Sequence, residues 1–128
     1  MIEPSREHDF AARQIVDSAF AVHTALGPGL LESVYERCLE YELKSRALDV
    51  ACQVALPVIY RDVSIDAGFR IDMIVNDLVV VEIKAIEKLL PIHEAQLLTY
   101  LKLSAKHVGL LINFNSVRIK DGIRRLIN

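Results

Sequence analysis

One apolar stretch, residues 78–85, constrains the fold more than any other part of the chain. It reads Leu-Val-Val-Val-Glu-Ile-Lys-Ala, and its β-branched residues are typical of a strand covered on both faces. Glu82 and Lys84 interrupt it two residues apart, so a strand points both side chains to the same face. Burying such charges is unfavourable unless a partner or a metal ion compensates for the lost hydration. We therefore expect a functional site on this strand.

The chain before residue 50 predicts two amphipathic helices. Ser5 is placed to cap a helix that carries apolar side chains at a helical spacing and stops at Gly27. After a glycine-rich turn, a second helix repeats this spacing as far as Leu43. Glu32 lies in its first turn, where the positive end of the helix dipole favours a carboxylate. Capping alone explains Glu32, but the turn would equally let it project into a pocket.

Beyond residue 50 the apolar residues no longer recur at helical spacing but at every second position, which predicts strands. Three antiparallel strands form a meander, a helix follows Pro91, and a last strand completes the sheet. A strand, helix, strand connection favours a right-handed crossover, so the last strand runs parallel to the charged one. The tail from Arg118 to Ile127 fits an edge strand or a short helix. The expected elements are strands at 51–60, 65–75, 78–85 and 108–114, and a helix at 93–104.

These elements predict one α/β domain with a mixed sheet over residues 1–128. At 128 residues with 52% hydrophobic content, the chain suits a single domain with its own core. No apolar stretch reaches the ~20 residues that span a bilayer, and residues 1–4 begin neither a secretory nor a transit signal. We expect a cytoplasmic protein without a membrane partner.

The strand before the charged run supplies a second carboxylate, Asp72, whose two apolar neighbours should both point to the opposite face. Two carboxylates from adjacent strands, with a main-chain carbonyl such as that of Ile83, form an oxygen-ligand set that suits Mg²⁺ or Mn²⁺. Lys84, on the same face as Glu82, can orient or help deprotonate an attacking water and offset charge on a phosphorane-like transition state. These residues predict metal-dependent hydrolysis of a phosphodiester.

A shared metal ion requires Asp72 and Glu82 to lie on the same face of the sheet. A two-residue loop at Asn76-Asp77 would leave Glu82 on the wrong side. A three-residue loop such as residues 75–77, or a bulge, restores the same side, and Asn and Asp tolerate the left-handed conformation that it needs. We therefore predict a connection of odd parity, with the two carboxylates ~4 to 5 Å apart.

The site residues occur in a pattern that resembles one nuclease superfamily. An aspartate followed ten residues later by a Glu-x-Lys triplet resembles the motif of the PD-(D/E)XK nuclease superfamily. A later Gln-x-x-x-Tyr resembles the QxxxY element of its RecB and lambda-exonuclease-like branch. The residues that carry this resemblance are Asp72, Glu82, Ile83, Lys84, Gln96 and Tyr100.

Residues 26–36 and 89–101 carry a closer resemblance, to the small bacterial proteins of the GxxExxxR family, which is placed in that superfamily. The similarity covers nearly the whole chain. It implies a restriction-endonuclease-like core and a nuclease that uses Mg²⁺ or Mn²⁺ and acts on nucleic acid, with DNA as the first expectation and RNA as the alternative. The implied roles are metal ligands for Asp72 and Glu82, an accessory ligand for Glu32, the catalytic lysine for Lys84, and orientation of the substrate or of that lysine for Gln96. We place Tyr100 with these catalytic residues and the Ile83 carbonyl with the metal ligands.

The chain departs from these patterns at two positions. Ile71 stands where the superfamily name has a proline, which is common in this branch. The GxxExxxR spacing asks for arginine at position 36, where the chain has Glu36, and the arginine follows as Arg37. We assign no site role to that arginine.

Charge is unevenly distributed along the chain. The net charge of −2 argues against a protein that coats nucleic acid by bulk electrostatics. Residues 1–94 hold 9 basic and 16 acidic side chains, whereas residues 95–128 hold six basic ones against Asp121 alone. This basic segment fits either a solvated face or a patch that faces phosphates. If the segment is a phosphate-facing patch, Lys102, Arg118 and Lys120 bind the substrate. We assign the same role to Arg70, which lies earlier in the chain.

Two other function classes stay open. A nucleic-acid or partner-binding module would keep the fold without turnover, but it has no need to retain the unfavourable charges of Asp72, Glu82 and Lys84. A metal-dependent hydrolase of nucleotides or other small phosphate esters is the second class, and the basic segment favours a polymer over it. Because a domain of this size has little room for a substrate clamp, we also expect a homodimer.

Overall fold

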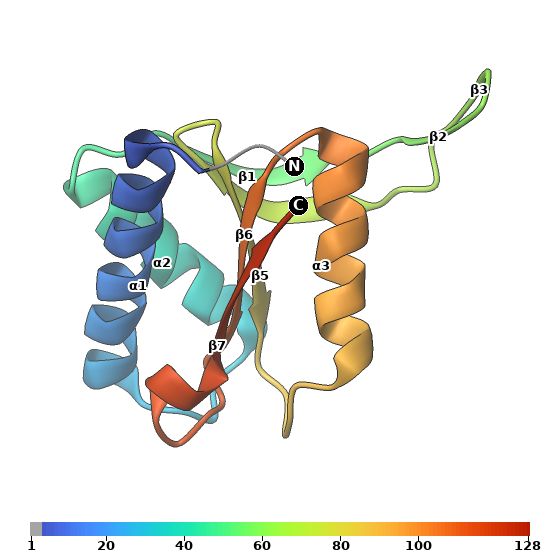
Figure 1. Cartoon of the computed structure of the whole chain (residues 1–128). Helices are drawn as coiled ribbons and strands as arrows, with labels where there is room; N and C mark the ends of the chain where they lie inside the picture. Colours follow the sequence, from blue (N-terminus) through green and yellow to red (C-terminus); the bar gives the residue numbers. More distant parts are fainter. Residues whose placement is uncertain (1–3) are drawn as a thin grey trace.

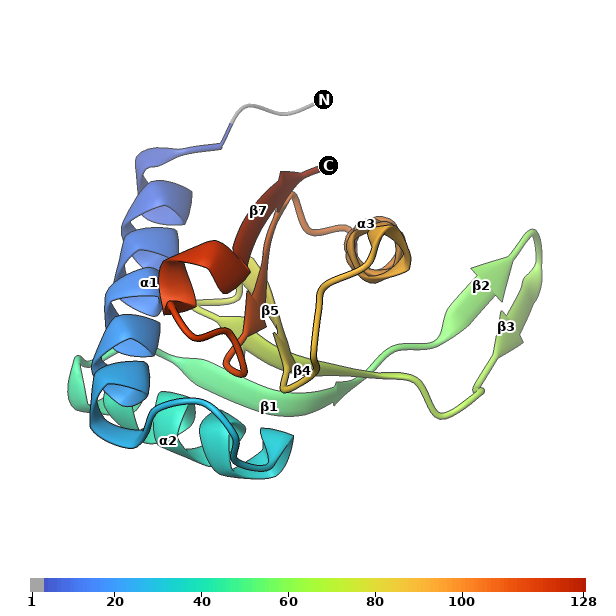
Figure 2. The same ribbon diagram turned by 90° about the horizontal axis from the view of Figure 1, so that it is seen from below.

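The computed structural model describes residues 4–128. Five strands form one mixed sheet in the order β1-β4-β5-β6-β7, with α1 and α2 on one face and α3 on the other (Figures 1 and 2). The predicted α/β class with two N-terminal helices is confirmed. Along the chain the elements are α1 (Arg6–Leu26), α2 (Glu32–Ser45), β1 (Val50–Ala55), β2 (Val58–Tyr60), β3 (Val63–Ile65), β4 (Arg70–Val75), β5 (Val79–Lys84), α3 (Pro91–Ser104), β6 (Val108–Asn113), η1 (Ile119–Gly122) and β7 (Ile123–Ile127).

The helices begin and end close to the predicted residues. The Ser5 hydroxyl caps α1 by accepting a hydrogen bond from the His8 N–H at 3.3 Å, and Gly27, with φ of 73°, ends the helix. α3 begins two residues earlier than predicted, at Pro91, because the fixed φ and missing N–H of proline suit the first helical turn. Each helix therefore has a local reason for its position.

β5 is the central strand and is buried on both faces. Its odd-numbered residues, such as Val81, pack in the core beneath α1 and α2, against Ile15 and Leu39. Val80 faces the other way and packs beneath α3, against Leu97. The apolar run predicted to be covered on both sides is therefore covered by helices from both layers.

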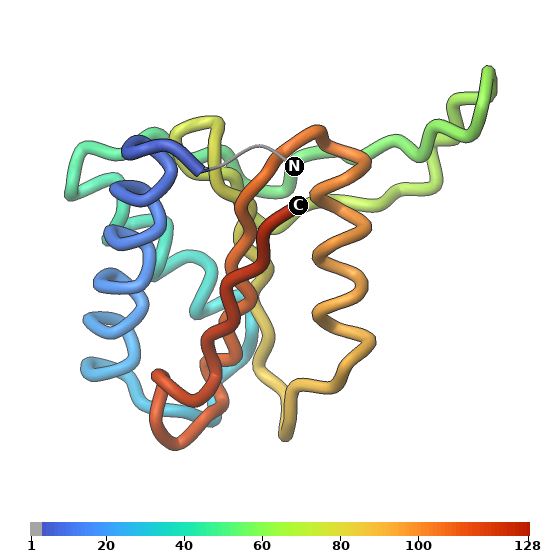
Figure 3. The backbone as a smooth tube through the Cα atoms, in the orientation of Figure 1, coloured from blue at the N-terminus to red at the C-terminus, as the bar shows by residue number. Residues whose placement is uncertain are grey.

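The first two predicted strands are each broken, and their inner parts form a separate hairpin. β1 pairs antiparallel with β4, whereas β2 and β3 pair only with each other. The strands at 51–60 and 65–75 are interrupted near the two residues where the sequence indicates an edge or bulge and a bend: Pro57 has no N–H for the ladder, and Gly68, with φ of 77°, turns the chain. The hairpin projects beyond the sheet, as the backbone trace shows (Figure 3).

The second half of the sheet follows the predicted connection. β5 runs antiparallel to β4, and β6 lies parallel to β5 after the α3 crossover. The tail contains both of the structures considered for it, the short helix η1 and then the edge strand β7, which pairs antiparallel with β6. The antiparallel meander β1-β4-β5 and the parallel strand after the crossover are thus confirmed.

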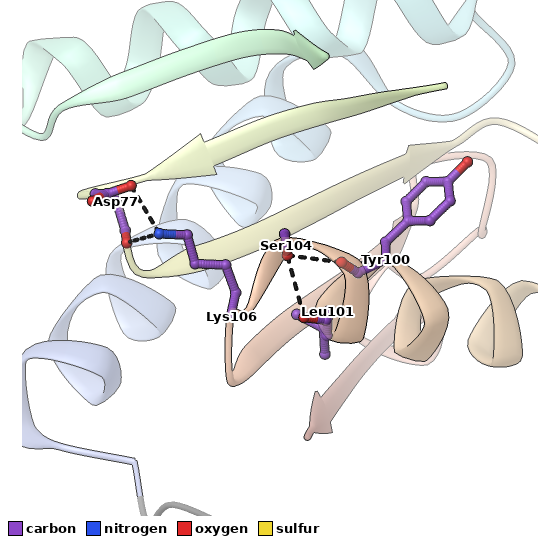
Figure 4. Close-up of polar contacts among 5 residues, drawn as sticks. All are labelled: Asp77, Tyr100, Leu101, Ser104 and Lys106. Atoms are coloured by element: carbon purple, nitrogen blue, oxygen red, sulfur yellow. Dashed lines mark hydrogen bonds and ion pairs between the residues drawn. The ribbon is translucent and has the colours of Figure 1, made fainter. Parts of the chain in front are cut away.

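The β4–β5 connection has the predicted odd parity. Val75 pairs with Val79, so the loop contains the three residues 76–78, one position later than the example 75–77. Asn76 and Asp77 are in the left-handed region, with φ of 53° and 55°. Lys106 holds this loop, because its Nζ donates to the carbonyl oxygen of Asp77 at 2.8 Å and to its Oδ1 at 2.9 Å (Figure 4).

Within residues 4–128, no helix is long and apolar enough to cross a membrane. Met1–Glu3, on which part of the expectation about targeting signals depends, lie outside the described residues.

Substitution of Gly122 by alanine should destabilise the turn between η1 and β7. A Cβ there would lie 2.6 Å from the main-chain oxygen of Asn113 and against the Ser116 side chain. We expect Gly122→Ala to lower the free energy of unfolding by about 1–3 kcal/mol, measured by urea denaturation. Gly68→Ala is the control, because its Cβ meets nothing within 4 Å and only the positive φ is unfavourable. Equal losses in the two variants would contradict the packing argument.

Candidate active site

The backbone ladder between β4 and β5 stops one residue short of the two carboxylates. The last backbone pair joins Met73 and Val81, so Asp72 and Glu82 stand opposite each other as the next pair. The Asp72 N–H donates to Glu82 Oε1 at 3.2 Å, and the Ile83 N–H donates to Asp72 Oδ2 at 2.8 Å. Each carboxylate therefore accepts a hydrogen bond from the opposite strand where a ladder carbonyl would otherwise do so.

At Asp72 the side chains of β4 stop alternating regularly between the two faces of the sheet. Met73 packs in the core beneath α1 and α2, whereas Ile71 packs in the core beneath α3. The expectation that both apolar neighbours of Asp72 share one face is therefore wrong. A regular strand would alternate, but the neighbouring β1 is irregular opposite Asp72, where Gln53 has φ of 53° and makes no ladder pair. This irregularity lets the Asp72 side chain reach across to β5.

Glu82 is the most deeply buried acid of the site, with 5% of its surface exposed. Burial raises the pKa of Glu82 from 4.5 to about 8, and the charge of Asp72 and a hydrogen bond between the two carboxyl groups add to this effect. The Asp72 N–H and the charge of Lys84 act in the opposite direction but do not cancel it. Without a cation, Glu82 is therefore mainly a neutral acid at pH 7, and a cation beside it would favour the ionised form.

Lys84, Gln96 and Tyr100 line one cavity of about 700 Å³ on the α3 side of the sheet. Gln96 Nε2 donates to the Tyr100 hydroxyl at 3.3 Å, which confirms that the two residues share a face of the helix. Burial raises the pKa of Tyr100, and the negative charges of Glu82 and Asp72 raise it further. The structure thus brings the predicted lysine, glutamine and tyrosine to one cavity, next to the carboxylate pair.

Two glutamates of α2 approach Asp72 from the opposite layer. Glu32 is the first residue of α2; partial burial raises its pKa, the charge of Asp72 raises it further, and Lys84 lowers it. Glu36 lies one turn later, and burial and the charge of Asp72 also raise its pKa. Its Oε1 accepts a hydrogen bond from Gln53 Nε2 at 2.8 Å. We expected no site role for Glu36, which repeats the charge of Glu32 one helical turn later.

The donor set around Asp72 fits a hard divalent cation. Mg²⁺ binds through one or two carboxylates, with waters and substrate phosphate as its other ligands. Asp72 and Glu82 supply two carboxylates. Because the N–H and C=O of a strand residue point to the same side, the Ile83 carbonyl also faces Asp72. In the described part of the chain, no three His, Cys, Asp or Glu side chains form a preformed metal cluster.

Tyr35 fixes the glycine-rich turn that precedes Glu32. Its hydroxyl donates to the Gly27 carbonyl at 2.6 Å and accepts from the Leu30 N–H at 3.0 Å. Its ring stacks on Phe114 with centroids 4.7 Å apart. The helical period marks Tyr35 as a core residue, but no pattern in the sequence indicates where its hydroxyl bonds.

Asn113 is a site residue that the sequence analysis missed. It lies opposite Lys84 at the carboxyl end of β6 and is 2% exposed. Its Oδ1 accepts from the Ile86 N–H at 3.1 Å, and its Nδ2 donates to the Ile86 carbonyl at 3.0 Å. Asn113 therefore fixes the segment that follows Lys84. The available signal is a polar residue at the end of an apolar run, which needs partners once it is buried.

The four cations assigned to substrate binding are exposed and do not line the cavity around Lys84. Arg70 is the first residue of β4, and Lys102 lies on α3. Arg118 and Lys120 follow the carboxyl end of β6, which lies beside the carboxyl end of β5 at Lys84. Their contact with a substrate remains a prediction.

Comparison with known proteins gives one match. A family model described as the PD-(D/E)XK nuclease superfamily matches residues 9–126. The match extends from within α1 to β7 and contains every residue of the site. The mixed sheet with its parallel β5–β6 pair agrees with a restriction-endonuclease-like fold. No curated protein and no solved structure matches the chain.

The raised pKa of Glu82 predicts a pH-dependent stability in the absence of divalent cations. In the folded protein Glu82 keeps its proton up to about pH 8, whereas in the unfolded chain it releases the proton near pH 4.5. The stability that Glu82 contributes is therefore complete below pH 4.5 and is lost as the pH rises through about 8. We expect the free energy of unfolding, measured with urea in EDTA, to fall by on the order of a few kcal/mol across this window. In Glu82→Gln the free energy of unfolding should no longer fall with pH across this window. The same pH dependence in Glu82→Gln and wild type would show that Glu82 is not the group that titrates.

Proposed function

Since the chain belongs to the PD-(D/E)XK nuclease superfamily, we propose that it is a metal-dependent nuclease that hydrolyses phosphodiester bonds of DNA, with RNA as the alternative substrate. One observation carries the proposal. At the end of a ladder, the Asp72 N–H donates to Glu82 and the Ile83 N–H donates to the Asp72 carboxylate, directly beside the cavity that Lys84 lines. A buried glutamic acid beside a half-buried aspartate and a lysine is unfavourable for folding, which points to a functional role.

Asp72, Glu82 and the Ile83 carbonyl would hold Mg²⁺ or Mn²⁺, and Glu32 would act as an accessory ligand through water. The bound cation would supply Lewis-acid polarisation of the phosphate. By holding the cation, the two carboxylates would set where a phosphate lies relative to Lys84. The approach of Glu32 and Glu36 to Asp72 adds negative potential at this point, which favours a cation.

Lys84 acts as the residue that orients the attacking water and offsets charge in the transition state. Its position supports this role, because it lies two residues from Glu82 on the same face and lines the cavity. Gln96 and Tyr100 form a hydrogen-bonded pair on the opposite wall and orient either the lysine or the substrate. Asn113 keeps the chain after Lys84 in place.

The finer assignments are part of the same proposal. The Gln96–Tyr100 pair supports the RecB and lambda-exonuclease-like branch, and the glycine-rich turn before Glu32 supports the GxxExxxR family. Arg37 lines a groove between α1 and α2, which agrees with assigning it no site role. We also propose that residues 1–128 act as one domain, as a homodimer, in the bacterial cytoplasm.

The proposal predicts that Asp72→Ala, Glu82→Ala and Lys84→Ala each lose Mn²⁺-dependent cleavage by about 10³-fold or more, since each removes a charge from the transition-state site. Cleavage is measured on single-stranded, duplex and branched DNA, on RNA and on nucleotides. Lys44→Ala is the control, because Lys44 pairs with Glu40 on the surface of α2. Each carboxylate variant relieves repulsion but also removes the acceptor of a backbone N–H, that of Asp72 or of Ile83, so both should unfold at an equal or lower temperature than the wild type.

Full activity in all three variants, or unfolding of Lys84→Ala, would replace the catalytic interpretation with a structural polar cluster. Cleavage of nucleotides alone would identify a small phosphate-ester hydrolase. Binding of nucleic acid without any Mn²⁺-dependent cleavage would identify a binding module.

A further inference from the structure

The β2–β3 hairpin is an exposed arm that the sheet does not stabilise. β2 and β3 form their own two-stranded sheet, joined at the Tyr60–Val63 pair, and all residues from 59 to 70 are exposed. The arm extends away from the body beside α3 (Figures 1 and 2). Its apolar side chains face solvent, with exposed fractions of 62% for both Ile59 and Tyr60. A two-stranded hairpin gains little stability alone, and a cluster of exposed apolar side chains marks an interaction site.

The base of this arm forms a wall of the candidate active site. Val58 begins β2 and Phe69 follows β3, and both line the same cavity as Lys84 and Tyr100. The Phe69 and Tyr100 rings lie with their centroids 6.4 Å apart. A chain bound at Lys84 on this side would therefore pass directly along the arm. This continuity favours the substrate over an unrelated protein as the molecule that covers the arm.

The chemistry of the arm selects unpaired bases over phosphates. Residues 58–70 carry two arginines and two aspartates, so the arm has no net charge with which to attract a duplex backbone. At its tip, the guanidinium carbon of Arg61 lies 5.4 Å from the centroid of the Tyr60 ring. Aromatic rings and guanidinium planes are the groups on which unpaired bases stack, whereas a duplex already buries its base faces.

We propose that the β2–β3 hairpin is a base-stacking arm, that Tyr60 and Arg61 hold unpaired bases, and that the protein therefore acts on single-stranded or frayed nucleic acid. This inference rests on the proposed nuclease function for the identity of the bound polymer. It deepens that function by assigning a substrate class and a specificity residue outside the metal-binding strands.

Binding of fluorescein-labelled oligo(dT) and of its duplex with oligo(dA) tests the arm, measured by fluorescence anisotropy with Ca²⁺ in place of Mg²⁺. The wild-type protein should bind the single strand more tightly than the duplex. Tyr60→Ala should weaken single-strand binding by about tenfold and leave duplex binding unchanged, because stacking contributes roughly 1–3 kcal/mol per base. Tyr60→Phe should retain the affinity. Tyr41→Ala is the matched control, because Tyr41 is a 76% exposed tyrosine on α2 that lines a different groove.

Equal single-strand affinity in Tyr60→Ala and wild type would overturn the inference, as would wild-type preference for the duplex. A change of oligomeric state in Tyr60→Ala, seen by sedimentation without a change in affinity, would overturn it in favour of an arm that joins two copies. Tyr60-dependent binding without Mn²⁺-dependent cleavage would support the arm and contradict the nuclease. Cleavage with the same strand preference in Tyr60→Ala and wild type would support the nuclease and contradict the arm.

Discussion

The site depends on two hydrogen bonds that cross between neighbouring strands at the end of their ladder. The Asp72 N–H donates to the Glu82 carboxyl, and the Ile83 N–H donates to the Asp72 carboxyl. Backbone N–H groups must find acceptors when they are buried, and here side-chain oxygens replace carbonyls. The sheet therefore gains part of its own hydrogen bonding from the two carboxyl groups of the site. The fold and the candidate site are built from the same atoms, which explains how a buried glutamic acid beside a half-buried aspartate can persist in the folded state.

Contacts made by three other residues keep the strands and turns around the two carboxylates in position. Lys106 bonds to Asp77 in the loop that sets the β4–β5 register, and that register places the carboxylates opposite each other. Asn113 fixes the chain immediately after Lys84, and Tyr35 fixes the turn before Glu32. These contacts come from parts of the chain that are far apart in sequence. They hold the loop, the turn and the segment after Lys84 in place around the two carboxylates.

The sequence was sufficient for the parts of the fold that depend on short-range patterns. The spacing of apolar residues predicts the helices and the central strand. Asn76 and Asp77 tolerate the left-handed backbone conformation, which explains why the loop between β4 and β5 has an odd number of residues. The separate hairpin was not predicted because alternation alone cannot show where Pro57 ends a pairing. Glu36 and Asn113 were missed as site residues because their partners, Gln53 and Ile86, are 17 and 27 residues away. Such partnerships are tertiary contacts, which a local pattern does not encode.

The position of a bound cation tests the account most directly. Crystals soaked in Mn²⁺ should give one anomalous difference peak between Asp72 and Glu82, roughly 2.1 Å from an oxygen of each and from the Ile83 carbonyl. Glu82→Gln crystals should show that peak weakened or absent, since an amide oxygen is a poorer ligand than a carboxylate. A peak held only by Glu32 and Glu36, or no peak between β4 and β5 in crystals of an active protein, would contradict the claim that the end of this ladder is the metal site.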